Sequence, residues 1–252
     1  AVATVIAQGF SALYCLLVLR KIRDIRLEKE DFYRQPSMSL RLLKLGTPLA
    51  IQNVIISVGG LTVQYVINGF GFLFVAGFTA TNKLYGILEM AAVSYGYAIT
   101  TYVGQNLGAK KIKRIKKGYR AALVLDVCFA IIAFIVIETL HTQISSLFLG
   151  KDGTALAYQV SGGYMRWIGY FFIFMGIKMA TDGVLRGLGI MRPFLIANMV
   201  NLAIRLSVAL ICAPRFGIEF VWLAVPAGWL ANFLISYMAL RKSWPVDKTI
   251  GE

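Results

Sequence analysis

Long apolar runs alternate with short polar stretches along the whole 252-residue chain. Most of these runs reach the roughly 20 residues that an α-helix needs to cross the hydrocarbon core of a bilayer. The pattern therefore predicts an all-α integral membrane protein that crosses the bilayer several times. We expect seven apolar segments, at Ala1–Leu19, Gly46–Phe70, Phe72–Gly108, Gly118–Leu140, Gly162–Asp182, Pro193–Ala213 and Gly217–Leu240.

The polar stretch 20–45 is the best candidate for a domain boundary. It carries both charge signs and contains Pro36, so we expect a linker that ends in an amphipathic lead-in. Residues 46–242 would then form a compact set of six helices, and 243–252 a tail. The sequence opens inside an apolar run with no basic region before it, which is not typical of a signal peptide. We therefore expect residues 1–19 to belong to a longer polypeptide.

The composition and the placement of charge both favour a membrane protein. Hydrophobic residues make up 58% of the chain and charged residues 15%, against about 25% charged residues in soluble domains. The net charge is +14, but 20 of the 26 Lys and Arg residues lie at 20–44, 110–120, 186–192 and 241–248. These stretches share one side of the membrane if each segment crosses once, and the positive-inside rule makes that side cytoplasmic.

We therefore expect a multi-pass protein of the plasma membrane with its C-terminus in the cytoplasm. Its basic loops would contact anionic lipid, and nucleic acid is not an expected partner. Enzyme chemistry has little support, because no CxxC, HExxH, GxSxG or Walker motif is present and the single histidine, His141, is expected in a loop. We expect no catalytic residue, no metal site and no organic cofactor.

Ionisable residues inside membrane segments are costly and are therefore candidates for function. Lys178 and Asp182 are four residues apart and share a helix face, so they either neutralise each other or line a translocation path. Glu89 is the deepest carboxylate and shares its face with Tyr85, which makes it a candidate for binding a proton or a cation. Asp126 is expected to cap or pair near the interface.

Several uncharged and charged polar residues recur at helical spacing within the apolar segments. They are Asn53 and Gln64 on one segment and Asn198, Asn201 and Arg205 on another. A helix surrounded by lipid would leave such groups unsatisfied. We expect them to bond to other helices or to line a wet cavity. Gly183 and Gly187 have GxxxG spacing, which lets two helices approach closely.

A short motif marks the junction between the third apolar segment and the basic stretch 110–120. It reads Val-Gly-Gln-Asn-Leu-Gly-Ala over 103–109, with Gly104, Gln105, Asn106 and Gly108 as its signature residues. This motif resembles the end of the eighth helix in the multidrug and toxic compound extrusion (MATE) transporters. Leu-Gly-Thr-Pro-Leu-Ala at 45–50 and the stretch 182–189 are similar to the start of that family's seventh helix and the end of its tenth.

The resemblance covers nearly the whole chain and implies a MATE-like fold of the MOP superfamily, with two six-helix lobes around a cavity. Residues 1–19 would be the last helix of the N-terminal lobe, 20–45 the cytoplasmic linker between lobes, and 46–242 the C-terminal lobe. The rest of the N-terminal lobe would be the missing partner. The implied activity is export of cationic or amphiphilic drugs and toxic compounds in exchange for Na⁺ or H⁺ by alternating access.

The resemblance leaves the coupling residue open. Acidic residues that bind the cation in some branches of the family align near Ile56 and Met175, which are apolar here. Glu89 or Asp182 would then substitute, or the coupling residue lies in the N-terminal lobe. The candidates for lining a substrate cavity are Asn53, Gln64, Lys178, Asn198, Asn201 and Arg205.

Two alternatives remain open from the sequence. The first is a flippase for lipid-linked sugars, which shares the fold superfamily and would need a basic cavity. The second is an isolated half-lobe that is inactive or assembles with a partner. A membrane enzyme is a more distant reading, because it would need a metal or nucleophile constellation that the sequence does not show.

Overall fold

The computed structural model describes residues 2–22, 33, 35–150 and 153–244, and these residues are almost entirely helical, with no strand among them. The chain divides into two compact units, Ala1–Lys44 and Leu45–Glu252. The first unit contains α1 (Val2–Leu19), which has no buried residue. This apolar helix is long enough to cross the core of a bilayer.

Helix α2 (Pro36–Asn68) begins earlier than the apolar pattern predicts. We expected the second segment to start at Gly46, but the amphipathic lead-in is continuous with it. Proline is favoured at the first position of a helix, because its fixed φ suits the helix and its missing N–H needs no partner there. From Leu45 onward α2 belongs to the second unit.

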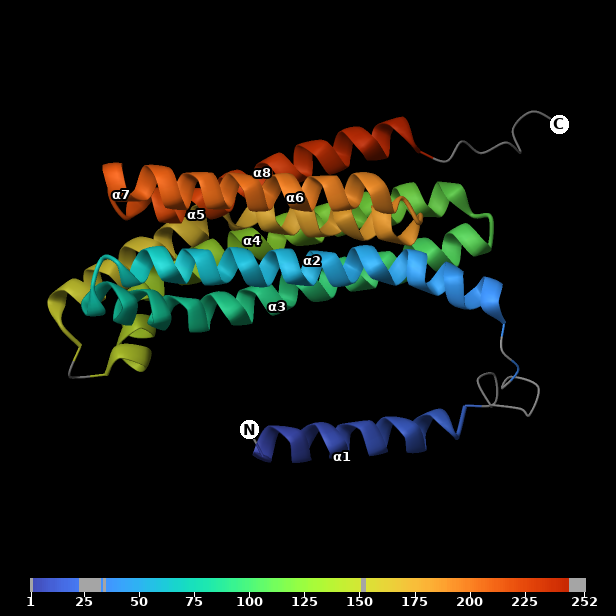
Figure 1. Cartoon of the computed structure of the whole chain (residues 1–252), viewed down its shortest axis with the longest axis horizontal. Helices are drawn as coiled ribbons and strands as arrows, with labels where there is room; N and C mark the ends of the chain where they lie inside the picture. The colour runs from blue at the N-terminus through green and yellow to red at the C-terminus, as the bar shows by residue number, and fades with distance from the viewer. Residues whose placement is uncertain (1, 23–32, 34, 151–152, 245–252) are drawn as a thin grey trace. The chain divides into compact units, whose positions relative to one another are not determined.

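The second unit is a bundle of long helices (Figure 1). After α2 come α3 (Phe72–Gly108), α4 (Ile112–Leu149), α5 (Ala155–Gly187) and α6 (Met191–Ser207). A π-helical turn at Val208–Cys212 and the short α7 (Ala213–Phe216) continue α6, and α8 (Glu219–Lys242) ends the bundle. The bundle therefore has six long helical segments, at the places where the sequence predicts them.

Six helical segments among the described residues are long and apolar enough to cross a membrane, five of them in the second unit and the sixth being α1. Helix α3 is long enough but falls short in hydropathy, because polar side chains such as Asn82, Lys83 and Glu89 interrupt it. A crossing helix with such residues must face protein or water rather than lipid. This makes α3 the first place to look for a functional site.

Helix α5 forms the centre of the bundle and packs against α3, α4 and α8. Its contact with α3 is close because Gly183 and Gly187 lie at the seam. A Cβ at Gly183 would collide with the side chain of Ile99 and the carbonyl oxygen of Gly96, and one at Gly187 would collide with Val103. The close approach expected from the GxxxG spacing is thus confirmed.

Two local expectations are wrong. His141 lies inside α4 rather than in a loop, because α4 continues to Leu149. Asp126 neither caps nor pairs: it lies well inside α4, is 2% exposed against Gly176 of α5, and its Oδ2 has no partner among the described residues. The helix begins at Ile112, well before the apolar run, so Asp126 is too deep to serve as a cap.

Candidate functional site

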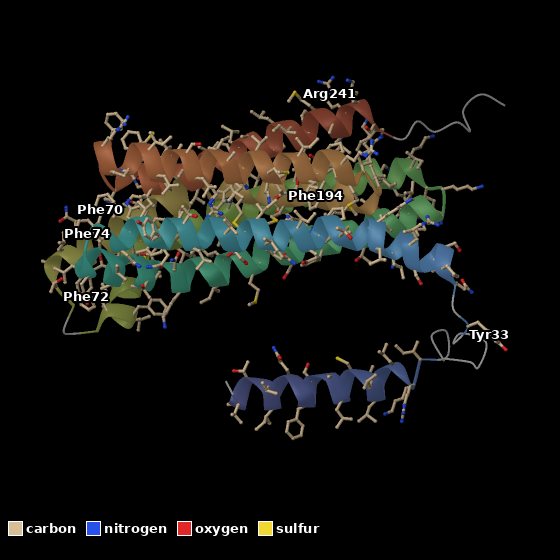
Figure 2. The ribbon with its side chains drawn as sticks, in the orientation of Figure 1. Tyr33, Phe70, Phe72, Phe74, Phe194 and Arg241 are labelled. Atoms are coloured by element: carbon tan, nitrogen blue, oxygen red, sulfur yellow. The ribbon has the colours of Figure 1, made fainter. Side chains whose placement is uncertain are left out.

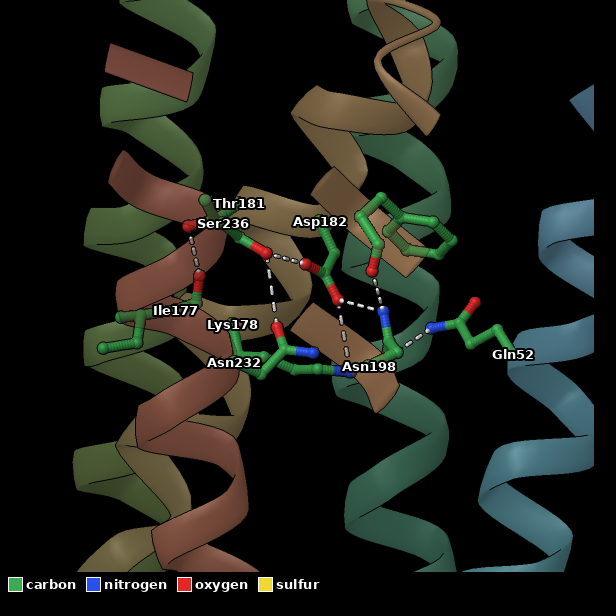
Figure 3. A network of polar contacts seen from close by, with 9 residues as sticks. Gln52, Ile177, Lys178, Thr181, Asp182, Asn198, Asn232 and Ser236 are labelled. Atoms are coloured by element: carbon green, nitrogen blue, oxygen red, sulfur yellow. Dashed lines mark hydrogen bonds and ion pairs between the residues drawn. The ribbon is translucent and has the colours of Figure 1, made fainter. Parts of the chain in front are cut away.

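A buried ion pair lies at the centre of the bundle (Figure 3). The Nζ atom of Lys178 is 3.3 Å from Oδ2 of Asp182, one turn further along α5. The Oδ1 atom of the same carboxylate accepts a hydrogen bond of 2.7 Å from the hydroxyl of Ser236 on α8. The pairing that the four-residue spacing allowed is therefore formed, and both carboxylate oxygens are engaged.

Asn198 of α6 extends this network towards α2. Its Nδ2 lies 3.5 Å from Oδ2 of Asp182 and donates at 2.8 Å to the carbonyl oxygen of Phe194. Its Oδ1 accepts from Nζ of Lys178 at 3.4 Å and from Nε2 of Gln52 at 3.3 Å. The network thus ties α2, α5, α6 and α8 together.

The network is closed to solvent. Asp182 is fully buried and Lys178 is 2% exposed. Buried charges are tolerated when they are paired and their remaining hydrogen-bonding capacity is used, as it is here. The arrangement ties four helices together and leaves neither oxygen of the carboxylate without a partner.

A second carboxylate, Glu89 on α3, has different surroundings. It lines a cavity of about 170 Å³ to which α2, α3, α5, α6 and α8 all contribute. Oε1 of Glu89 accepts a hydrogen bond of 3.3 Å from the hydroxyl of Tyr85, one turn earlier. That hydroxyl also lies 3.8 Å from the sulfur of Met175. Glu89 is only partly buried, and its carboxylate can accept further hydrogen bonds from the cavity.

The cavity combines one carboxylate and one guanidinium with aromatic walls. Arg205 of α6 lines it, and among the described residues it forms no ion pair with Glu89. The ring of Tyr85 is stacked on Trp229 with centroids 6.2 Å apart, and Tyr164 is stacked on Trp222 at 4.2 Å. These stacks hold the walls rigid, while the two charged groups remain available to a ligand.

The other polar residues that the sequence suggested as cavity lining lie in different places. Gln64 lines the cavity beside Glu89 and bonds to Asn68 at 2.8 Å. Asn201 is 8% exposed, packs against Gly228 of α8 and has an unpartnered Oδ1 among the described atoms. Asn53 is exposed and lines neither place, because the register of α2 turns its neighbour Gln52 inward.

The motif at 103–109 forms the end of α3. Nδ2 of Asn106 donates to the carbonyl oxygen of Tyr102 at 2.8 Å, and the carbonyl of Asn106 accepts from the backbone N–H of Lys111 at 2.8 Å. Gly104, Gln105 and Gly108 are exposed. In this chain the motif ends a helix and turns the chain into α4.

Among the described residues, no group of three or more His, Cys, Asp and Glu is placed to hold a metal ion. Glu89 stands without a second carboxylate in the lining of its cavity. Apart from Glu89 and Arg205, the polar side chains that line the cavity are neutral.

Curated relatives match the chain along nearly all of its length. It is 25% identical over 255 residues to a probable multidrug resistance protein of Bacillus subtilis, YpnP, covering 100% of this chain and 56% of that protein. It is 27% identical over 234 residues to the probable multidrug resistance protein NorM of Thermotoga maritima, covering 90% of this chain and 49% of that protein. The chain thus spans about half the length of these relatives.

Solved structures share the fold. A multidrug resistance MATE family transporter of the MOP superfamily in an outward-facing conformation superposes with a TM-score of 0.86 at 18% identity, covering 98% of this chain and 56% of that chain. A MOP superfamily transporter from Pyrococcus furiosus gives 0.83 at 17% identity, covering 94% and 53%. The family model described as MatE matches residues 48–211, which include both carboxylate sites, and the chain therefore belongs to the MatE family.

Proposed function

We propose that this chain is the C-terminal half of a secondary active antiporter that exports cationic or amphiphilic organic compounds in exchange for Na⁺ or H⁺. Members of its family are transporters rather than enzymes, and two curated relatives are named as probable multidrug resistance proteins. Transport by alternating access needs a group that binds the coupling ion in one state and releases it in the other. The chain offers two carboxylates for that role, and they are not equivalent.

The observation that carries the proposal is the access of Glu89 to a cavity. Asp182 is fully buried and both of its oxygens are engaged, whereas Glu89 lines a cavity of about 170 Å³ and has one hydrogen-bond donor, Tyr85. A coupling group must exchange its ion without dismantling the fold. We therefore assign the coupling role to Glu89 and the structural role to Asp182.

The positions of two apolar residues support this choice. Ile56 and Met175 align near the acidic residues that serve some branches of the family. In this chain Ile56 lines the cavity of Glu89, and the sulfur of Met175 lies near the Tyr85 hydroxyl that bonds Glu89. The proposed coupling site thus occupies the same region, with its single carboxylate moved to α3.

The volume of the cavity indicates that the coupling ion and the exported compound bind at different places. About 170 Å³ is small beside the 300–1,000 Å³ of sites that enclose drug-sized ligands. It suits a cation with a few water molecules. The organic substrate would then contact a larger surface to which the other half of the transporter contributes, and its positive charge would compete with the coupling ion for Glu89.

The orientation follows from charge. We propose that the basic stretches 20–44, 110–120, 186–192 and 241–248 and the C-terminus lie on the cytoplasmic side of the plasma membrane, because they hold 20 of 26 Lys and Arg residues. Reporter fusions placed after α4 and after α8 of the natural full-length protein test this. A periplasmic reading after α8 would reverse the assignment.

Export by cells that express the natural full-length protein tests the function. Native protein should lower the accumulation of a fluorescent organic cation, and collapse of the ion gradients should abolish the effect. Glu89→Gln should reduce gradient-driven export about tenfold or more, since it removes the exchangeable charge while keeping an acceptor for Tyr85. Glu138→Gln, which removes a half-buried carboxylate of α4 that pairs with Arg166 on α5 outside the cavity, is the matched control. Equal export by native and Glu89→Gln protein would remove Glu89 from the mechanism.

A further inference from the structure

A groove of about 420 Å³ lies at the end of the bundle where α4 begins and α8 ends. Both helices pack against α5, and buried side chains of Tyr119 and Leu240 close the inner wall. Figure 2 shows Arg241 near the C-terminal end of α8. The groove is lined by three cationic and three aromatic residues, Lys116, Arg120, Arg241, Tyr119, Tyr237 and Trp244.

The cations of the groove converge without a compensating carboxylate. Lys116 and Arg120 are one turn apart on α4, and Arg241 joins them from α8. Within the part of the chain that the structure describes, none of the three forms an ion pair and no acidic residue lines the groove. Like charges one turn apart destabilise a helix. The arrangement therefore gains stability when an anion enters.

Helix stability does not explain why the cations are here. Helix α4 opens with Ile-Lys-Arg-Ile-Lys-Lys at 112–117 and has no acidic residue in its first turn. The positive end of the helix dipole lies at its N-terminus, where acidic residues stabilise and basic residues destabilise. Concentrating cations at that end is unfavourable for the isolated helix, so a bound anion offers the compensation that the helix itself lacks.

The aromatic residues and their neighbours give the groove an apolar continuation. The Tyr119 hydroxyl is 2.8 Å from Oγ1 of Thr181, which fixes its ring as a wall, and Trp244 packs against the buried cluster below. Tyr and Trp are enriched where a protein meets the interface of a bilayer. Away from the basic end, exposed apolar side chains continue along both helices, at Val124, Leu125, Leu234 and Met238.

We propose that this groove binds the head group of an anionic glycerophospholipid, with its phosphodiester among Lys116, Arg120 and Arg241 and its acyl chains along the apolar faces of α4 and α8. Basic pockets between membrane helices on the cytoplasmic side bind such head groups. A free phosphate would use the cations but not the apolar faces. The head group of phosphatidylcholine carries its own cation and would leave the three basic side chains uncompensated. The site is separate from the coupling site and extends beyond the proposed function.

Trp244 makes the site directly measurable. The natural full-length protein is reconstituted in phosphatidylcholine vesicles that contain a rising fraction of phosphatidylglycerol brominated on its acyl chains. Bromine quenches tryptophan on contact, and the difference between native and Trp244→Phe protein isolates the signal of Trp244. Half-quenching should occur at a low fraction of the anionic lipid. The triple variant Lys116→Gln, Arg120→Gln, Arg241→Gln should need a fraction of anionic lipid at least about tenfold higher for half-quenching.

Two matched variants decide whether the groove itself is responsible. Lys110→Gln, Lys111→Gln, Lys113→Gln removes the same charge from the neighbouring α3–α4 connection and the first turn of α4, and should leave the titration unchanged. The charge-conserving triple Lys116→Arg, Arg120→Lys, Arg241→Lys should retain the affinity, which excludes misfolding as the cause of any loss. Equal weakening in the two Gln triples, equal quenching by brominated phosphatidylcholine, or displacement of the lipid by millimolar inorganic phosphate would each overturn the proposal.

Discussion

Asp182 and Glu89 are both carboxylates inside long membrane helices, yet their neighbours differ completely. Asp182 has a lysine at 3.3 Å, a serine hydroxyl at 2.7 Å and no exposed surface. Glu89 has one tyrosine hydroxyl at 3.3 Å and an open cavity. The fixed partners of Asp182 engage both of its oxygens, whereas Glu89 has a fixed partner on one oxygen only.

The largest expected effect comes from breaking the buried pair. Asp182→Ala leaves the Lys178 ammonium unpaired in a dry interior, and removing one member of a buried pair costs about 3–5 kcal/mol. We expect a strong loss in the free energy of unfolding, measured by thermal denaturation of the full-length protein in detergent. Lys178→Met combined with Asp182→Leu should recover most of the loss. If Asp182→Ala melts like native protein, the network does not hold the bundle.

A smaller loss is expected at the partner on α8. Ser236→Ala removes the 2.7 Å hydrogen bond to Oδ1 of Asp182 and leaves that oxygen unsatisfied in a fully buried place. The expected cost is about 1–3 kcal/mol. Ser207→Ala, an exposed serine at the end of α6, is the matched control. Equal melting temperatures for the two variants would show that Ser236 does not stabilise the network.

The smallest effect on stability, and a selective one on coupling, is expected at Tyr85. Tyr85→Phe keeps the stack on Trp229 but removes the hydroxyl that bonds Glu89. Stability should fall by about 0.5–1.5 kcal/mol, while the ion concentration for half-maximal export should change several-fold. Tyr170→Phe, an exposed tyrosine on α5, should change neither. An unchanged ion dependence in Tyr85→Phe would separate Tyr85 from the coupling site.

Local periodicity predicted much of the fold. The bounds of α3 match the third apolar segment, and the spacing of Lys178 and Asp182 gave the ion pair. The apolar pattern missed helical turns that are not apolar. Both α2 and α4 extend through amphipathic or basic turns outside the predicted apolar segments. Helix propensity does not follow hydropathy, since Lys and Arg favour a helix about as strongly as Leu does.

The partners of the site needed the tertiary structure. Ser236 lies 54 residues from Asp182, and no local pattern links the two. On α2 the polar row that contains Asn53 reaches the cavity only further along, at Gln64, whereas Asn53 itself is exposed and the neighbouring Gln52 bonds to Asn198. Residues of five helices line the cavity around Glu89. Its volume, and the presence of Arg205 in the same wall, therefore depend on how those helices pack.

The most direct test of the account is ion exchange by the purified full-length protein on adding an organic cation substrate. Proton release into weak buffer and displacement of radioactive sodium are followed together. We predict that native protein releases the coupling ion, that Glu89→Gln does not, and that folded Asp182→Asn protein, selected by gel filtration, still does. Release that persists in Glu89→Gln and disappears in Asp182→Asn would contradict the assignment of the two carboxylates.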